Sequence, residues 1–149
     1  MNAESLINID ELKYLNTENV KDFSGMFKGC SSLSDIKALE NWNVSNGNNF
    51  SHMFFFCKSL SDIKALENWY VLSGNNFSHM FRYCNSLLDI KALENWNVSN
   101  GKYFNGMFSG CSIDISPLKK WNVSNKEYLD YIFKEDSEED IDEYIDEDI

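Results

Sequence analysis

The sequence predicts an α/β solenoid, a single domain in which short parallel strands line one side and short helices line the other. The first observation is a repeat: residues 50–69 recur almost unchanged as residues 77–96, and looser copies begin at Phe23 and Phe104. The second is that each copy contains two apolar patterns of different period. A fixed period near 27 residues indicates repeats that stack and bury one continuous core.

The first half of each repeat has the apolar spacing of one face of a short α-helix. In the second copy the apolar residues are Phe50, Met53, Phe54 and Cys57, at positions i, i+3, i+4 and i+7. A helix of two or three turns is not stable alone in water, so its apolar face must pack against another part of the repeat. We therefore expect one helix in every repeat, with columns of Phe, Met and Cys facing the core.

The second half of each repeat predicts a short strand followed by a column of tryptophans. Residues 35–38 alternate polar and apolar, as a half-buried strand does. This strand would place two rows of charge on its outer face, formed by Asp35, Asp62 and Asp89 and by Lys37, Lys64 and Lys91. The opposite charges of adjacent rows offset the repulsion within each row. The rows are consistent with a solvated sheet face and also with a charged strip that recognises a partner.

The order L-x-x-I-x-A-L-x-N-W-N-V-S-N, followed by F-x-x-M-F-x-x-C-x-S-L, resembles the BspA-like leucine-rich repeat of bacterial surface proteins and mycoplasma lipoproteins. The resemblance covers residues 7 to about 133. It implies a leucine-rich-repeat-like solenoid, a fold used for adhesion and protein binding. Because neighbouring strands lie about 4.8 Å apart and packed helices about 8–10 Å apart, we expect the strands on the concave side and the helices on the convex side.

The repeat divides the chain into three parts. Residues 1–15 are predicted to form an N-terminal half-repeat cap, because Ile9, Leu12 and Leu15 fall in the columns of the full repeats. Residues 16–133 hold about four repeats of 25–27 residues. Residues 134–149 form an acidic C-terminal tail or a capping helix.

The negative charge of the chain is concentrated in that tail. Residues 134–149 hold ten of the 24 acidic residues and one of the 13 basic residues, a net charge of −9 out of −11. Three interpretations remain open: a cap over the last coil, a disordered solubilising segment, and a docking segment for a basic, nucleic-acid-binding protein. In the docking interpretation the contacting residues are Glu138, Glu139, Asp140, Asp142 and Glu143. The basic residues are dispersed, so we expect no direct binding of nucleic acid.

The two middle repeats differ from the outer ones at three positions of the predicted helix. The substituted residues, which replace Gly, Lys or Ser of the outer repeats, are His52, Phe55, Phe56, His79, Arg82 and Tyr83. All six lie off the predicted core face, so we expect an exposed aromatic and basic patch that binds protein. Alternatively, Phe56 and Tyr83 only seal the gap between neighbouring helices. The two histidines share one repeat column, and no carboxylate or thiol there completes a site, so we expect no metal site.

The four cysteines occupy one core column at 27-residue intervals, which predicts buried thiols rather than disulfides or a zinc site. Free thiols, together with the absence of a signal peptide and of a long apolar stretch, favour a cytoplasmic location without a membrane span. A cell-surface location would require a leader that has been removed.

The sequence contains no phosphate-binding loop, catalytic triad or shielded pair of carboxylates, so we expect neither an enzyme nor a cofactor. The function predicted is non-enzymatic protein–protein interaction, in adhesion or binding. The alternative is a small acidic intracellular inhibitor of the phage anti-defence type, for example an anti-CRISPR, that blocks a nucleic-acid-binding enzyme.

Overall fold

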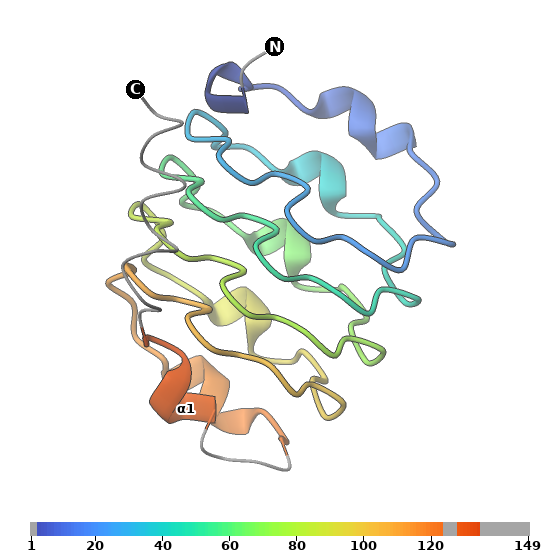
Figure 1. The fold of residues 1–149 in the computed structure, drawn as a ribbon. Coiled ribbons are helices and arrows are strands. Elements are labelled where there is room, and N and C mark those ends of the chain that lie inside the picture. The colour runs from blue at the N-terminus through green and yellow to red at the C-terminus, as the bar shows by residue number, and fades with distance from the viewer. Residues whose placement is uncertain (1–2, 124–127, 135–149) are drawn as a thin grey trace.

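The computed structural model describes residues 3–123 and 128–134, in which the chain winds through coils stacked from the N-terminus to the C-terminus (Figure 1). Coils 1 to 4 begin at Asp22, Asn49, Asn76 and Tyr103, which pair in parallel β-bridges. The 3₁₀ helices are η1 (Ala3–Ser5), η2 (Asp10–Tyr14), η3 (Lys37–Leu39), η4 (Lys64–Leu66), η5 (Lys91–Leu93) and η6 (Ser116–Lys120). One α-helix, α1 (Tyr128–Tyr131), follows them.

The segments predicted as α-helices are not helical; we call them the ladder segments, residues 22–30, 49–57, 76–84 and 103–111. In coil 2, alternate backbone N–H groups donate to the next coil, as from Phe50 to the Asn76 carbonyl at 2.8 Å and from Phe54 to the Met80 carbonyl at 2.9 Å. The apolar pattern nevertheless marks the core, since Phe50 and Phe54 are fully buried. The spacing therefore identified the inward side chains but not the backbone that presents them.

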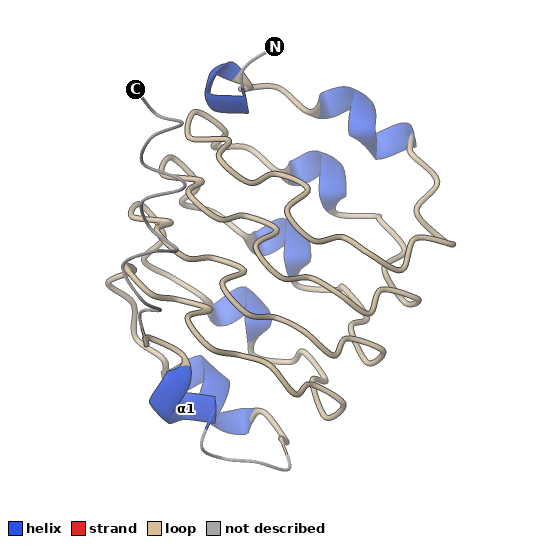
Figure 2. Ribbon diagram, in the orientation of Figure 1, coloured by secondary structure: helices blue, strands red, loops and turns tan. Residues whose placement is uncertain are grey.

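The segments predicted as strands lead into single turns of 3₁₀ helix, and η3, η4 and η5 lie in one column (Figure 2). Oδ1 of Asp35 accepts the backbone N–H of Lys37 at 2.9 Å, and the equivalent carboxylates of coils 2 and 3 do the same at 2.8 Å. This side-chain hydrogen bond competes with strand pairing and favours a turn. In the part of the chain that is described, isolated bridges replace the predicted strands.

The core consists of identical rings stacked from coil to coil. Neighbouring phenylalanines of the first column have centroids 5.3–5.4 Å apart and rings within 9° of parallel. The second phenylalanine column repeats this at 5.4–5.6 Å, and Trp42, Trp69 and Trp96 stack at 6.4 Å. Each aromatic contact adds about 0.5–1.5 kcal/mol to what the buried area contributes.

Polar hydrogens inside this core are satisfied by the preceding coil. Nε1 of Trp69 donates to the Leu39 carbonyl at 2.9 Å, and the other tryptophans make equivalent bonds to leucine carbonyls. Sγ of Cys57 donates to the Phe27 carbonyl at 3.2 Å, as the thiols of coils 3 and 4 do one coil further on. Each of these bonds fixes the register between two coils, because a buried donor without an acceptor is costly.

Different structures cover the two ends of the stack. At the start, Ile9 is buried and the Leu12 carbonyl accepts the indole N–H of Trp42. At the other end, the Tyr131 carbonyl at the end of α1 accepts the N–H of Gly106 at 2.8 Å. None of the described helices is both long and apolar enough to cross a membrane. The tail residues Glu138, Glu139, Asp140, Asp142 and Glu143, and the three interpretations of the tail, lie outside the described residues.

Candidate functional site

A shallow groove runs along the 3₁₀ side of the stack. Two hollows of about 500 and 480 Å³ open there, and both are lined by Asp62, Lys64 and Glu67 of coil 2. We define the Asp–Lys groove by the matching charged residues of three coils: Asp35, Lys37, Glu40, Asp62, Lys64, Glu67, Asp89, Lys91 and Glu94. The structure thus brings the predicted Asp and Lys rows together in one feature, although on 3₁₀ turns rather than on strands.

The local structure explains why these side chains face outward. In coil 2, Ile63 and Leu66 are buried on either side of η4, which leaves Lys64 and Glu67 exposed. Asp62 holds the start of the turn through its bond to the Lys64 N–H. Each coil therefore presents one Lys between two carboxylates, a net charge of −1, and repeats that set about 4.8 Å further along the stack.

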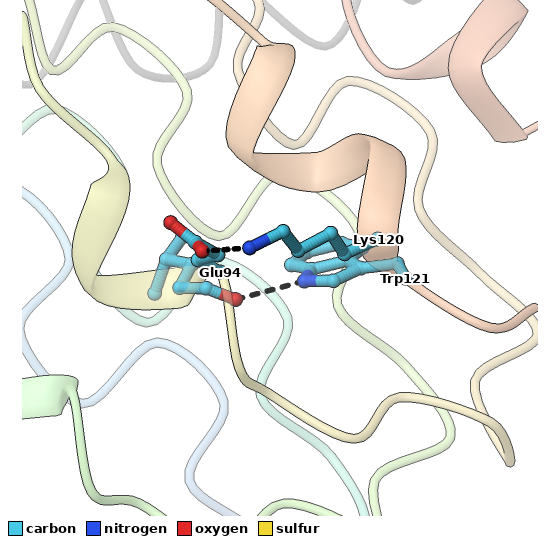
Figure 3. A network of polar contacts seen from close by, with 4 residues as sticks. Glu94, Lys120 and Trp121 are labelled. Carbon is cyan, nitrogen blue, oxygen red and sulfur yellow. Dashed lines mark hydrogen bonds and ion pairs between the residues drawn. The ribbon is translucent and has the colours of Figure 1, made fainter.

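Coil 4 ends the groove with an ion pair (Figure 3). Nζ of Lys120 contacts Oε1 of Glu94, and the neighbouring Trp121 donates its indole N–H to the Leu93 carbonyl at 2.8 Å. The hydrogen bond and the charge of Lys120 lower the pKa of the Glu94 carboxyl. Coil 4 carries Ser116 in the Lys column, so the repeated charge set covers coils 1 to 3 only.

The second candidate surface lies on the ladder segments of coils 2 and 3. We call it the His–Arg cluster and define it by His52, Phe55, Phe56, His79, Arg82 and Tyr83. The prediction that these side chains form an exposed patch is wrong for three of them: Phe55 and Arg82 are 1% exposed and His79 is 5% exposed. His52, Phe56 and Tyr83 are half-buried.

The rings of the cluster contact one another across the two coils. The Phe56 centroid lies 4.8 Å from that of Tyr83 and 4.9 Å from that of Phe55. The guanidinium carbon of Arg82 lies 5.1 Å from the Tyr83 centroid, within the range of a cation–π contact. Phe56 and Tyr83 therefore pack between coils, as the alternative interpretation expected, but they pack together with a buried cation.

The two histidines bring further polar atoms into the cluster. Their ring centroids are 4.7 Å apart. Nδ1 of His79 lies 3.5 Å from Nη1 of Arg82, and its Nε2 lies 3.4 Å from Nδ2 of Asn105. Across the described ranges, no group of three or more His, Cys, Asp or Glu side chains is placed to hold a metal ion. The chemistry of the cluster is cationic and aromatic.

Backbone conformation explains the error in the predicted exposure. His52, Phe56, His79 and Tyr83 have φ values of 57–62°, in columns where coils 1 and 4 carry glycine at 63–77°. These left-handed residues interrupt any α-helix, so positions 52, 55 and 56 do not project as a helical wheel predicts. The sequence contained a signal against an α-helix here. Gly25 and Gly29 are four residues apart, and a helix this short does not tolerate two helix-weakening residues.

The four thiols are not suited to nucleophilic chemistry. Burial raises the pKa of Cys57 and Cys84 well above the ordinary thiol range, and raises that of Cys111 to about 11. The thiolate is the reactive form of cysteine, and these sulfur atoms remain protonated at neutral pH. Cys57, Cys84 and Cys111 instead donate hydrogen bonds inside the core.

Comparisons with known proteins give one clear result. The family model described as "Mycoplasma protein of unknown function, DUF285" matches residues 1–111 and, in an overlapping second match, residues 61–145. No curated protein matches the chain. Among solved structures, an internalin (inlF) from Listeria monocytogenes is 14% identical with a TM-score of 0.17; the alignment covers 85% of this chain and 61% of the internalin chain.

Proposed function

We propose that this chain, which belongs to the Mycoplasma protein family of unknown function DUF285, is a non-enzymatic protein-interaction module that binds its partner along the Asp–Lys groove. One observation carries the proposal. The groove repeats a single set of charged residues on three successive coils, all of them exposed except the half-buried Glu94, whereas the aromatic, Leu and Cys columns of the same coils are buried in the core.

The groove suggests the chemistry of its partner. Coils 1 and 2 each offer two carboxylates and one ammonium group, and coil 3 offers the same set with Glu94 paired to Lys120, so a complementary surface carries more basic than acidic side chains. Such complementarity steers the encounter and fixes the register of binding more than it adds affinity. We infer a protein partner with an extended basic segment that spans several coils.

We further infer that the stack is a leucine-rich-repeat-like solenoid of the BspA-like type. The repeated motif supports this, as do the 27-residue period and the cross-coil stacking of identical side chains. Adhesion or binding is then the expected use of the scaffold. The non-enzymatic part of the proposal is supported by the openness of the groove, because no wall shields its carboxylates from solvent.

The test is a cross-linking pull-down from the native host with a triple variant, Lys37→Ser, Lys64→Ser and Lys91→Ser. Coil 4 has Ser116 in this column, so the scaffold accommodates serine there. The control changes three exposed lysines outside the groove to serine: Lys13, Lys21 and Lys102. We expect a partner that is captured by the wild type and the control but lost from the groove variant. Equal capture by all three proteins would place binding elsewhere.

The uneven charge favours a second candidate, an acidic inhibitor that blocks a nucleic-acid-binding enzyme through residues 134–149, which carry −9 of the net charge. Binding through that segment would weaken steeply between 50 and 500 mM salt, because it depends on exposed charges. It would also be lost when the tail acids are neutralised, with the groove intact. The groove variant and the tail variant therefore separate the two candidate functions.

A further inference from the structure

We propose that the His–Arg cluster is the docking site of the chain's own acidic C-terminal segment, residues 135–149. The described chain leads to this place. Its last residue, Lys134, has its carbonyl oxygen beside Gly106, where a Cβ atom would lie 3.1 Å from that oxygen and 2.4 Å from Nδ1 of His79. The segment that follows Lys134 therefore starts next to the cluster.

The segment is long enough to reach every residue of the cluster. Fifteen extended residues span roughly 50 Å, at about 3.3 Å per residue. The cluster belongs to coils 3 and 2, which lie about 5 and 10 Å from coil 4, respectively, when adjacent coils are about 4.8 Å apart. Because the segment is tethered, its effective concentration at the cluster exceeds that of a free partner.

Charge and apolar character are complementary between the two. Residues 135–149 contain ten Asp and Glu and no basic residue, together with Ile141, Tyr144, Ile145 and Ile149. The cluster contains Arg82 and two titratable histidines, and Lys28 of coil 1 shares the column of Phe55 and Arg82. A buried guanidinium is stabilised by carboxylates that approach it with good hydrogen-bond geometry. The half-buried rings of Phe56 and Tyr83 offer contact area for the isoleucines and the tyrosine.

Backbone strain at the cluster supports a role beyond the scaffold. Coils 1 and 4 satisfy the left-handed positions with glycine, whereas coils 2 and 3 place His52, Phe56, His79 and Tyr83 there. Strained residues persist where the interactions of their side chains compensate. Docking of the acidic segment provides interactions that glycine at these positions cannot make. The proposal does not depend on the function assigned to the Asp–Lys groove, which lies on the 3₁₀ side of the coils.

The first test uses the full chain and its two histidines, which give only two Cε1–H signals in a proton NMR titration. In the test variant every Asp and Glu of residues 135–149 is changed to Asn or Gln. We expect the pKa of both histidines to fall by about one unit, a tenfold loss of proton affinity, because nearby carboxylates favour the charged imidazole. The control variant, Glu40→Gln with Glu67→Gln and Glu94→Gln, leaves both titrations unchanged. Histidines that titrate alike in the test variant and the wild type would overturn the proposal.

The second test measures how well the cluster protects the tail from a Glu-specific protease. The variant His52→Gly with His79→Gly introduces glycine, the residue that coils 1 and 4 carry in this column, and so removes both imidazoles without a residue foreign to the scaffold. We expect cleavage at Glu138, Glu139 and Glu143 to be at least tenfold faster in this variant, relative to cleavage at the exposed Glu18 of the same chain. The Lys13→Ser, Lys21→Ser, Lys102→Ser protein serves as the control. Equal relative rates in wild type and variant would contradict docking on the cluster.

Discussion

The imidazole ring of His79 lies over the α-carbon of Gly106, so closely that a methyl group on that carbon would fall 2.4 Å from Nδ1. Tyr83 has the same relation to Gly110, because a methyl group on the Gly110 α-carbon would lie 2.5 Å from Cδ1 of the Tyr83 ring. The large side chains of coil 3 thus occupy the space that the glycines of coil 4 leave open. This pairing of large and absent side chains determines how the ladder segments of coils 3 and 4 pack together.

The first prediction separates the crowding at Gly106 from its backbone conformation. Gly106→Ala places a Cβ against the His79 ring at φ +64°, whereas Gly29→Ala has φ +77° with no atom within 4 Å. We expect Gly29→Ala to lower the free energy of unfolding by about 1 kcal/mol, from the left-handed backbone alone. Gly106→Ala should cost roughly 1–3 kcal/mol more, because of overpacking. Urea denaturation followed by circular dichroism measures both, and equal losses would contradict the contact.

The second prediction concerns the hydrogen bond from Trp69 to the Leu39 carbonyl. Trp69→Phe removes the donor and leaves a buried carbonyl unsatisfied, which costs about 1–3 kcal/mol before any cavity effect. Trp42→Phe is the comparison, since its acceptor Leu12 lies only partly buried at the end of the stack. We expect a larger shift of the urea midpoint for Trp69→Phe. A reversed order would show that the bond does not hold the register.

The third prediction tests the role of Asp62 in starting η4. Asp62→Ala removes the acceptor of the Lys64 N–H and should lower the free energy of unfolding by about 0.5–2 kcal/mol. Asp62→Asn keeps an oxygen at the same position, as Asn49 and Asn76 do in equivalent turns, and should cost far less. Thermal unfolding of the two variants provides the comparison. Equal destabilisation would mean that charge, rather than the turn, makes Asp62 important.

The fourth prediction concerns acid. The hydroxyl of Ser116, and then its backbone N–H, lower the pKa of Asp114, and Ser24 does the same for Asp22. A carboxyl whose pKa is lower in the folded chain than in the unfolded chain stabilises the folded state. This stabilisation is fully present above the unfolded pKa of about 4. It is lost as the pH falls through the folded pKa. We expect Ser24→Ala with Ser116→Ala to reduce the loss of stability between pH 5 and pH 2. The urea midpoints of the wild type and the double variant, measured across that pH range, test the prediction. If both proteins lose the same stability between pH 5 and pH 2, the two serines do not lower the pKa values of these carboxyls.

The fifth prediction concerns the thiols, whose pKa values are raised by burial. In the folded protein at pH 8, Cys111 should react first with iodoacetamide, because it is half-buried whereas Cys30, Cys57 and Cys84 are buried. Cys57 and Cys84 should react only after unfolding in urea. Peptide mass spectrometry identifies the labelled residues, with Cys111→Ser as the control. Rapid labelling of all four folded thiols would refute the packing of this column.

The sequence predicted burial far better than backbone conformation. The spacing of Phe50, Met53, Phe54 and Cys57 marks residues that the structure buries completely. The same spacing suits an α-helix and a chain of turns whose side chains point inward at similar intervals. Hydrogen bonds between residues 26 positions apart decide between them, and no local pattern contains that information.

The two candidate surfaces differ in how far the sequence foretold them. The Asp and Lys residues flank a buried isoleucine in each coil, so their outward direction follows from alternation, although their 3₁₀ turns do not. The His–Arg cluster was assigned to an exposed helical face, whereas Phe55 and Arg82 are buried. Phe55 contacts Tyr83 of the neighbouring coil, and left-handed residues flank both side chains, at positions 52 and 56 and at positions 79 and 83.

The sequence by itself determined the repeat length, the inward columns and the concentration of charge near the C-terminus, because these depend on residue type and spacing alone. Only the tertiary structure decided that the ladder segments are chains of turns joined by hydrogen bonds between coils. It also decided that the Asp residues precede 3₁₀ helices rather than lying in strands, and that His79 and Tyr83 cover Gly106 and Gly110. The physical reason is that backbone hydrogen bonds and left-handed conformations in one coil are stabilised by the coil stacked beside it.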